Sequence, residues 1–106
     1  MDLITREQLK ARIDAAEEFK LVMALNEFAF NAMHIPGSIH FQSADQAFEL
    51  LDPDDDIVVY CSDEACVASK FASEALVRAG YRHVRRYAGG LSDWAAAGYP
   101  LEGAST

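Results

Sequence analysis

The sequence predicts an α/β fold in which a central, mostly parallel sheet carries helices on both faces. Short apolar runs alternate along the chain with segments of helical periodicity. This alternation is typical of parallel strands joined by helical crossovers. A second observation concerns Cys61, which ends one apolar run shortly before a helical pattern begins. Functional sites of parallel sheets form outside the carboxyl ends of the strands, so Cys61 is the first candidate for a functional residue.

The length and composition indicate one folded domain. The chain has 106 residues, of which 51% are hydrophobic and 25% charged, as in an ordinary globular protein. We expect a compact, monomeric single domain over residues 1–106, with a core from about 5 to 102 and a loose tail at 103–106. No internal repeat or linker interrupts it.

The charge of the chain argues against two classes of partner. Seventeen acidic residues against nine basic ones give a net charge of −8, which repels nucleic acid. No apolar stretch approaches the roughly 20 residues that span a bilayer, and the start lacks a basic segment followed by an apolar one. We therefore expect no nucleic-acid or membrane partner and a cytoplasmic location.

The first half of the chain is predicted to alternate helices and strands. Thr5 and Gln8 form the ends of an S/T-x-x-E/Q capping box, which predicts a helix over 5–17. Pro36 disfavours helical backbone at Ile35, so the next helix ends before it. The other predictions for this half are a buried strand over 19–25, a helix over 27–33 capped by Asn26, a brief strand over 38–41, and a helix to Leu51 capped by Ser43.

The second half is predicted to continue this alternation around Cys61. The run Ile57 to Tyr60 predicts the strand that ends at Cys61, and a helix is expected over 67–79, ended by Gly80. On this helix the residues expected to face the sheet are Ala68, Phe71, Ala72, Ala75, Leu76 and Ala79. The last predicted elements are a strand over 83–87, a tight turn at Gly89 and Gly90, and a helix over 91–97 stopped by 98–100.

Several segments in this order resemble single-domain rhodaneses, the sulfurtransferases that carry sulfur as a cysteine persulfide. No segment is specific alone, but their order and spacing cover about residues 5 to 102. The segments that carry the resemblance are His34-Ile35-Pro36-Gly37-Ser38-Ile39, Ile57-Val58-Val59-Tyr60-Cys61, Ala75-Leu76, Ala79-Gly80-Tyr81, Gly89-Gly90-Leu91-Ser92-Asp93-Trp94 and Ala97-Gly98-Tyr99-Pro100.

The resemblance implies a rhodanese-like fold with Cys61 as the catalytic, persulfide-carrying cysteine. It also implies a loop that follows this cysteine and curls so that its amides point at the sulfur. Two features depart from the common pattern. Met23 and Leu25 stand where many relatives have an Asp and an Arg, and the loop resembles a variant with C-x4-C spacing. The expected substrate-binding loop consists of Ser62, Asp63, Glu64, Ala65, Cys66 and Val67.

The chemistry expected of Cys61 is that of an activated thiolate. Amide groups at a helix start stabilise a thiolate, which is the nucleophilic form of cysteine. Loop amides can also hold the terminal persulfide anion, so no general base is needed. In a reducing compartment the two cysteines are expected to be thiols rather than a structural bridge. C-x4-C without further Cys or His ligands is a poor metal motif, so we expect neither metal nor cofactor.

Two interpretations of Cys66 stay open. It can be a resolving thiol that attacks a Cys61 persulfide, releases sulfide and leaves a Cys61–Cys66 disulfide. The alternative, which the frequent burial of free cysteine favours, is a small apolar residue at the helix start. A rigid loop could hold the two sulfur atoms apart.

The expected partners are a small sulfur-containing donor and a thiol acceptor, with a partner protein as a further candidate. Asp63 and Glu64 disfavour the thiosulfate dianion and favour a neutral polysulfide or a persulfide. The alternative is that both carboxylates only solubilise the rim of the loop. Arg82, Arg85 and Arg86 form a basic cluster that is either a contact for an acidic group or, as we favour, a solvated strand face.

Two other functions compete with sulfur transfer. Cysteine phosphatases use a C-x5-R loop, but Val67 and Ala68 stand where that arginine would be, which argues against phosphoryl chemistry. The more serious alternative is a rhodanese-like module that binds a partner or senses sulfur or redox species without turnover. Met23, Leu25 and the acidic loop favour the module, whereas Cys61 favours the enzyme.

Overall fold

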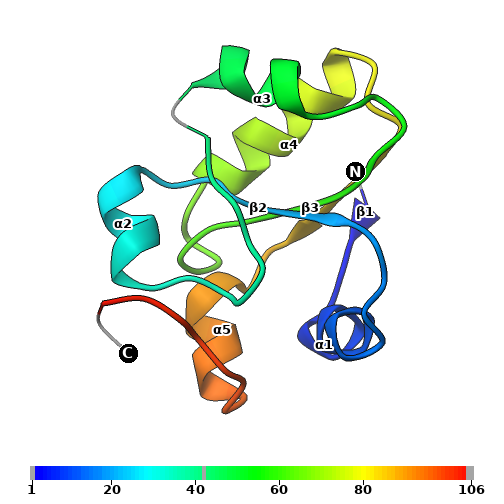
Figure 1. Cartoon of the computed structure of the whole chain (residues 1–106). Coiled ribbons are helices and arrows are strands. Elements are labelled where there is room, and N and C mark those ends of the chain that lie inside the picture. Colours follow the sequence, from blue (N-terminus) through cyan, green and yellow to red (C-terminus); the bar gives the residue numbers. More distant parts are fainter. Residues whose placement is uncertain (1, 42, 105–106) are drawn as a thin grey trace.

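A four-stranded parallel sheet forms the centre of the molecule. The computed structural model describes residues 2–41 and 43–104. The strands lie in the order β1-β4-β3-β2, and each neighbouring pair is parallel (Figure 1). The strands are β1 (Asp2–Leu3), β2 (Lys20–Met23), β3 (Asp56–Tyr60) and β4 (His83–Tyr87). The predicted α/β class with a parallel sheet is confirmed.

Helices cover both faces of this sheet, as predicted (Figure 1). One face packs against α3 (Ala44–Leu50) and α4 (Ala68–Arg78) through a cluster that contains Val22, Val59 and Leu76. The opposite face packs through Leu9, Val58 and Trp94. The elements on that second face are α1 (Arg6–Asp14), α2 (Glu27–Ala32) and α5 (Gly90–Ala96).

The central strand β3 explains the apolar run before Cys61. Ile57 and Val59 belong to the cluster on one face, while Val58 and Tyr60 belong to the cluster on the other. A strand that is buried on both faces needs apolar side chains at successive positions rather than alternating ones. The run therefore fixes β3 in the middle of the sheet and places the residue after it at the carboxyl edge.

The three predicted N-caps form as expected. The Thr5 side chain accepts the N–H of Gln8, and the Gln8 side chain accepts the N–H of Thr5, which completes the capping box of α1. Asn26 caps α2 by accepting from Ala29, and Ser43 caps α3. Helix α1 ends before the predicted boundary, because Ala15 is its C-cap and Ala16 has a positive φ of 54°.

Three features at the edges of the fold differ from the predictions. The expected strand over 38–41 is reduced to one parallel bridge between Ile39 and Val22. Strand β1 was not predicted, because two residues are too few to show an alternating pattern. The predicted loose tail is held where it is described, since the Ala104 N–H donates to the Asn31 carbonyl at 2.9 Å. Residues 105 and 106 of that tail lie outside the described residues.

The face that α4 turns towards the sheet also differs from the prediction. Phe71 was expected to pack on the sheet but is 62% exposed, and Ala75 is exposed as well. The buried residues of α4 are Ser69, Ser73 and Leu76. Two serines can lie there because their hydroxyl groups have partners, and the Ser73 hydroxyl donates to the Ser69 carbonyl at 2.6 Å.

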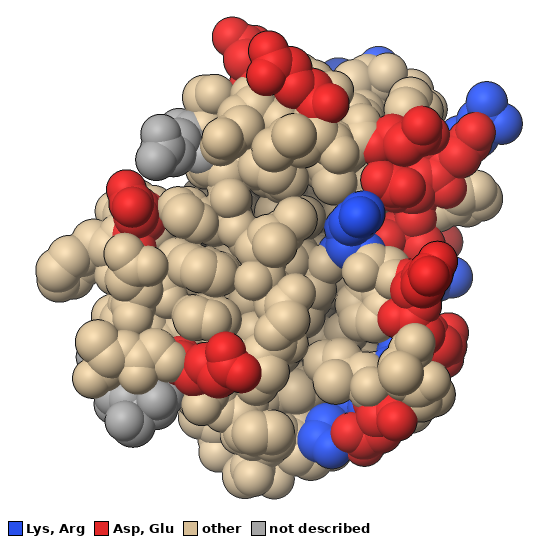
Figure 2. All heavy atoms as spheres, viewed as in Figure 1, with Lys and Arg blue, Asp and Glu red and all other residues tan. Residues whose placement is uncertain are grey.

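Much of the acidic character gathers away from Cys61. Figure 2 shows acidic side chains concentrated along one side of the visible face, whose middle carries little charge. A group of acidic residues lies at the amino ends of β2 and β3, the edge opposite Cys61: Glu17, Glu18, Asp54, Asp55 and Asp56. Within the described ranges, no helix has both the length and the apolar character needed to span a membrane.

Candidate functional site

Cys61 lies immediately beyond the carboxyl end of β3 and is only 1% exposed. Helix α5 fixes the main chain at this point. The N–H of Leu91 donates to the Cys61 carbonyl at 3.0 Å, and the N–H of Ser92 donates to the Ser62 carbonyl at 2.8 Å. The sheet and the first turn of α5 therefore determine the position of Cys61 together.

The loop after Cys61 is closed by the side chain of Asp63. Its Oδ1 accepts the N–H groups of Ala65 at 3.0 Å and of Cys66 at 3.1 Å. These are two of the amides that were expected to point at the Cys61 sulfur. The structure thus corrects this expectation for these two amides, because a carboxylate of the loop itself accepts from them. Glu64, Ala65 and Val67 are exposed, while Ser62 is half-buried.

Cys61 and Cys66 are joined by a disulfide in the structure. Their Cα atoms are 6.4 Å apart, within the range that a disulfide spans. The expectation of two free thiols is therefore wrong for this state, and the loop does not hold the sulfur atoms apart. The turn closed by Asp63 explains the pairing, since it brings the chain back towards Cys61. Cys66 is half-buried rather than buried in the core.

Tyr60 ties the segment that starts at His34 to the end of β3. Its hydroxyl oxygen accepts the N–H of Ile35 at 3.0 Å and lies 2.8 Å from the Ser38 hydroxyl. Burial raises the pKa of the Tyr60 phenol, so this hydroxyl stays neutral and can donate as well as accept. The His34 ring lies 2.8 Å from the Phe30 carbonyl through Nδ1, which agrees with a local structural role.

Asp93 anchors the start of α5 behind the loop. Its carboxylate accepts from the Tyr87 hydroxyl at 2.6 Å and pairs with Arg6 at 3.2 Å. Burial, and then the hydrogen bond to Asp93, raise the pKa of the Tyr87 phenol. These contacts hold α5 against β4 and α1, and so stabilise the amides that bind the Cys61 and Ser62 carbonyls.

The three arginines near β4 do not form one solvated face. Arg82 pairs with Asp54, and Arg85 lies 3.7 Å from Asp56. Arg86 instead points to the cysteine loop, where its Nη2 donates to the Cys66 carbonyl at 3.3 Å. The sequence could not reveal this contact, because residues 20 positions apart give no periodic signal.

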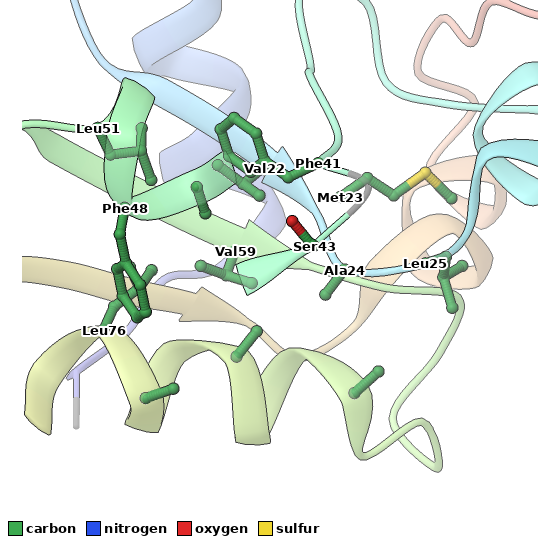
Figure 3. Close-up of a pocket in the computed structure, with 14 residues that line it drawn as sticks. Val22, Met23, Ala24, Leu25, Phe41, Ser43, Phe48, Leu51, Val59 and Leu76 are labelled. Carbon is green, nitrogen blue, oxygen red and sulfur yellow. The ribbon is translucent and has the colours of Figure 1, made fainter. Parts of the chain in front are cut away.

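An apolar hollow of about 300 Å³ lies on the α3 and α4 face of the sheet. Figure 3 shows Leu51 and Phe48 near one end, with Ala24 and Leu25 at the end where α4 begins. This second end lies beside the cysteine, because the Ala24 N–H donates to the carbonyl of Tyr60. Leu25, one of the two residues that depart from the common pattern, thus contributes apolar surface next to the loop.

Comparisons with known proteins agree on the family of this fold. The profile of the rhodanese-like domain matches residues 5–97. The chain is 28% identical to the rhodanese-like domain of a protein from Anabaena sp., with a TM-score of 0.88, and the match covers 99% of this chain and 81% of that one. It is 26% identical to a thiosulfate sulfurtransferase from Pseudomonas aeruginosa, with a TM-score of 0.84, covering 100% of this chain and 21% of the other.

One similar protein is a transcriptional regulator. The chain is 40% identical over 103 residues to an HTH-type transcriptional regulator of Mycobacterium tuberculosis. The match covers 95% of this chain and 45% of that protein. The chain therefore spans less than half the length of this relative.

Proposed function

The chain belongs to the rhodanese-like domain family, and we propose that it is a sulfurtransferase domain that takes up sulfane sulfur as a persulfide on Cys61 and passes it on. The observation that carries this proposal is the pairing of Cys61 with Cys66 at the carboxyl edge of the sheet. It supports Cys66 as the resolving thiol and as the nearest nucleophile that can act on a persulfide of Cys61.

The proposed reaction has two balanced steps. The Cys61 thiolate attacks the sulfane sulfur of a donor, so that a new sulfur–sulfur bond forms on Cys61. The remainder of the donor leaves as a thiolate when the donor is an organic persulfide and as sulfite when it is thiosulfate. The Cys66 thiolate then attacks the inner sulfur of this persulfide, and the outer sulfur leaves as hydrosulfide. The two cysteines are oxidised to the disulfide, while the sulfane sulfur is reduced. A dithiol reductant returns the pair to thiols.

The Cys61–Cys66 disulfide is the oxidised state in which the two proposed steps end. An external thiol can compete with Cys66 by attacking the outer sulfur, which transfers the sulfur and regenerates the Cys61 thiol. The close spacing of the two cysteines favours the internal reaction when no such acceptor is present. Cys66 therefore decides between transfer of sulfur and release of sulfide.

A direct test follows the products of one turnover. The reduced protein is mixed with glutathione persulfide, and intact mass and released sulfide are measured together. We expect one hydrosulfide per chain and a protein that has lost two hydrogens. With excess external thiol acceptor, persulfide should appear on that acceptor instead. If neither an added sulfur nor a disulfide forms with any sulfane donor, the proposed function is wrong.

The geometry of the loop disfavours the compact thiosulfate dianion as a donor. Asp63 and Glu64 belong to a shallow hollow over the loop, which also contains Gly89, Ser92 and Asp93. The Asp63 carboxylate already occupies two loop amides that an anion would otherwise bind. The apolar hollow beside Leu25 adds surface for an organic substituent. We therefore assign thiosulfate a minor role and small organic persulfides the main one.

Asp63→Asn should raise the rate of sulfur uptake from thiosulfate about threefold at low ionic strength. The amide oxygen can still accept from Ala65 and Cys66, so the loop keeps its turn while it loses one charge. The gain should shrink at high salt and be absent for a neutral dialkyl trisulfide. Stopped reactions read by intact mass give both rates.

Glu64→Gln is the matched control, because it removes an equal charge from the same exposed loop and keeps the Asp63 side chain that closes the turn. It should raise the thiosulfate rate less than Asp63→Asn does. Equal rates for Asp63→Asn and the unmodified protein would show that the loop charge does not select the donor.

A second function is favoured by the similarity to a transcriptional regulator. In that case the Cys61–Cys66 pair senses sulfur species and changes the binding of a partner, with no need for rapid turnover. Measuring the rate of repeated sulfide release with a dithiol reductant separates the two. Turnover at many cycles per minute supports the enzyme, whereas a single cycle followed by a stable disulfide supports the sensor.

A further inference from the structure

Arg86 lies on β4 with its guanidinium against the end of the cysteine loop. Its Nη2 donates to the Cys66 carbonyl at 3.3 Å, and its Nε donates to the Ser69 hydroxyl at 2.9 Å. The side chain therefore joins the sheet to the last part of the loop and to the first turn of α4. Since a guanidinium binds through a rigid planar fork, two such bonds restrict the position of Cys66.

Two buried serines of α4, Ser69 and Ser73, complete the contacts that hold Arg86. Ser69 is 1% exposed and Ser73 is fully buried, although the sequence predicted apolar residues against the sheet. The Ser69 hydroxyl accepts from Arg86, and the Ser69 carbonyl accepts from the Ser73 hydroxyl. A buried hydroxyl is costly unless it is hydrogen-bonded, so Ser69 provides a specific acceptor for Arg86. The guanidinium is thus fixed on two sides.

The charge of Arg86 is not used in a salt bridge within the part of the chain that the structure describes. The two neighbouring arginines do form ion pairs, Arg82 with Asp54 and Arg85 with Asp56. Arg86 is half-buried and bonded to the main chain of Cys66. The guanidinium is therefore available to hold the main chain of Cys66 in place.

Resting on the persulfide chemistry proposed above, we propose that Arg86 is a positioning residue that holds Cys66 ready to attack the persulfide on Cys61. Arg86 forms no covalent bond and gives up no proton in this step. The Cys66 thiolate forms the bond to the inner sulfur, and hydrosulfide carries away the outer one. Arg86 contributes by keeping Cys66 close to Cys61.

Arg86→Met should slow the conversion of the Cys61 persulfide to the disulfide about tenfold, without slowing the formation of the persulfide. The reduced variant is mixed with glutathione persulfide, quenched at intervals and analysed by intact mass. The persulfide form should accumulate, and sulfide release should lag behind sulfur uptake. The disulfide should also become easier to reduce, with a tenfold change in its equilibrium equal to about 30 mV.

Three further variants separate positioning from a loss of structure. Arg82→Met removes an equal charge from the segment before β4 but makes no contact with the loop, so its conversion rate should equal that of the unmodified protein. Arg86→Lys should restore part of the rate, because it keeps the charge but loses the planar fork. Ser69→Ala removes only one acceptor and should delay conversion less than Arg86→Met. This milder variant also tests the proposal if Arg86→Met does not fold.

The variant Cys66→Ser distinguishes failure of this inference from failure of the proposed function. As a single variant, Cys66→Ser should still take up one sulfur atom on Cys61. This result tests the proposed sulfurtransferase function independently of Arg86. Adding Arg86→Met to it should leave the uptake rate unchanged, since the step that Arg86 assists is already absent. The inference is overturned if Arg86→Met converts the persulfide at the unmodified rate. It is also overturned if Arg86→Met slows sulfur uptake by the same factor in the protein with Cys66 and in the Cys66→Ser variant.

Discussion

Replacing Cys61 by serine is expected to abolish sulfur uptake from every sulfane donor, a loss on the order of a thousandfold or more. A serine hydroxyl stays protonated at neutral pH and is a poor nucleophile towards sulfur. The substitution changes little in volume at a site that is 1% exposed, so the fold should persist. The measurement is intact mass after exposure of the reduced variant to glutathione persulfide, a neutral trisulfide and thiosulfate.

Cys66→Ser is the matched control for this result. It removes the other cysteine of the pair and leaves the Cys61 environment in place, so sulfur uptake should continue and the product should stop at the persulfide. Sulfur that appears on the Cys61→Ser protein at the unmodified rate would identify Cys66 as the primary acceptor. It would reverse the roles assigned to the two residues.

These proposed roles agree with the position at which each cysteine is held. Cys61 is fixed by β3 on one side and by the Leu91 amide on the other, whereas Cys66 lies in a loop closed by Asp63 and Arg86. A nucleophile that must meet incoming donors benefits from a constant position. A resolving thiol must instead lie close to the persulfide that it attacks, and the bonds from Arg86 and to Asp63 hold Cys66 at such a position. The strand end therefore suits sulfur uptake, and the loop position suits release of sulfide.

The architecture could be predicted from the sequence because local signals agree with one another. The capping residue Thr5 marks the start of α1, and the uninterrupted apolar run of β3 indicates a strand buried on both faces. The position of Cys61 at a carboxyl edge then follows from the parallel alternation. These features depend on residues close in sequence, which is why a single chain reveals them.

The details of the site depend on contacts between distant segments, which the sequence does not show. The pairing of Cys66 with Cys61 depends on the path of the loop, which the Asp63 carboxylate closes. The inward position of Ser69 is explained by Arg86, which lies 17 residues further along the chain. A helical pattern that counts serine as polar predicts that Ser69 faces solvent. The hydrogen bond from Arg86 is what allows its hydroxyl to be buried instead.

Gly90 is a second position whose role emerges only in the structure. The sequence indicates a tight turn at Gly89 and Gly90, and Gly90 has a positive φ of 64°. A Cβ atom there would collide with the Cys61 carbonyl oxygen and would lie 2.9 Å from the Ser62 carbonyl carbon. The glycine therefore permits the close approach of α5 on which the position of Cys61 depends.

Gly90→Ala should lower the free energy of unfolding by about 2–5 kcal/mol, from left-handed backbone strain together with overpacking against the loop. To relieve the collision, α5 must move away and weaken the bonds from Leu91 and Ser92 to the Cys61 and Ser62 carbonyls. Any folded protein should also take up sulfur more slowly. Denaturant unfolding and the uptake rate with glutathione persulfide measure the two effects.

Gly98→Ala separates the collision from the strain. Gly98 also has a positive φ, 76°, but a Cβ atom there meets nothing within 4 Å. This variant should lose only the backbone contribution of about 1–2 kcal/mol and take up sulfur at the unmodified rate. If both alanine variants lose equal stability and both keep full uptake, the contact between Gly90 and the Cys61 carbonyl does not position the nucleophile. A loss confined to Gly90→Ala means that the start of α5 belongs to the site as much as the loop does.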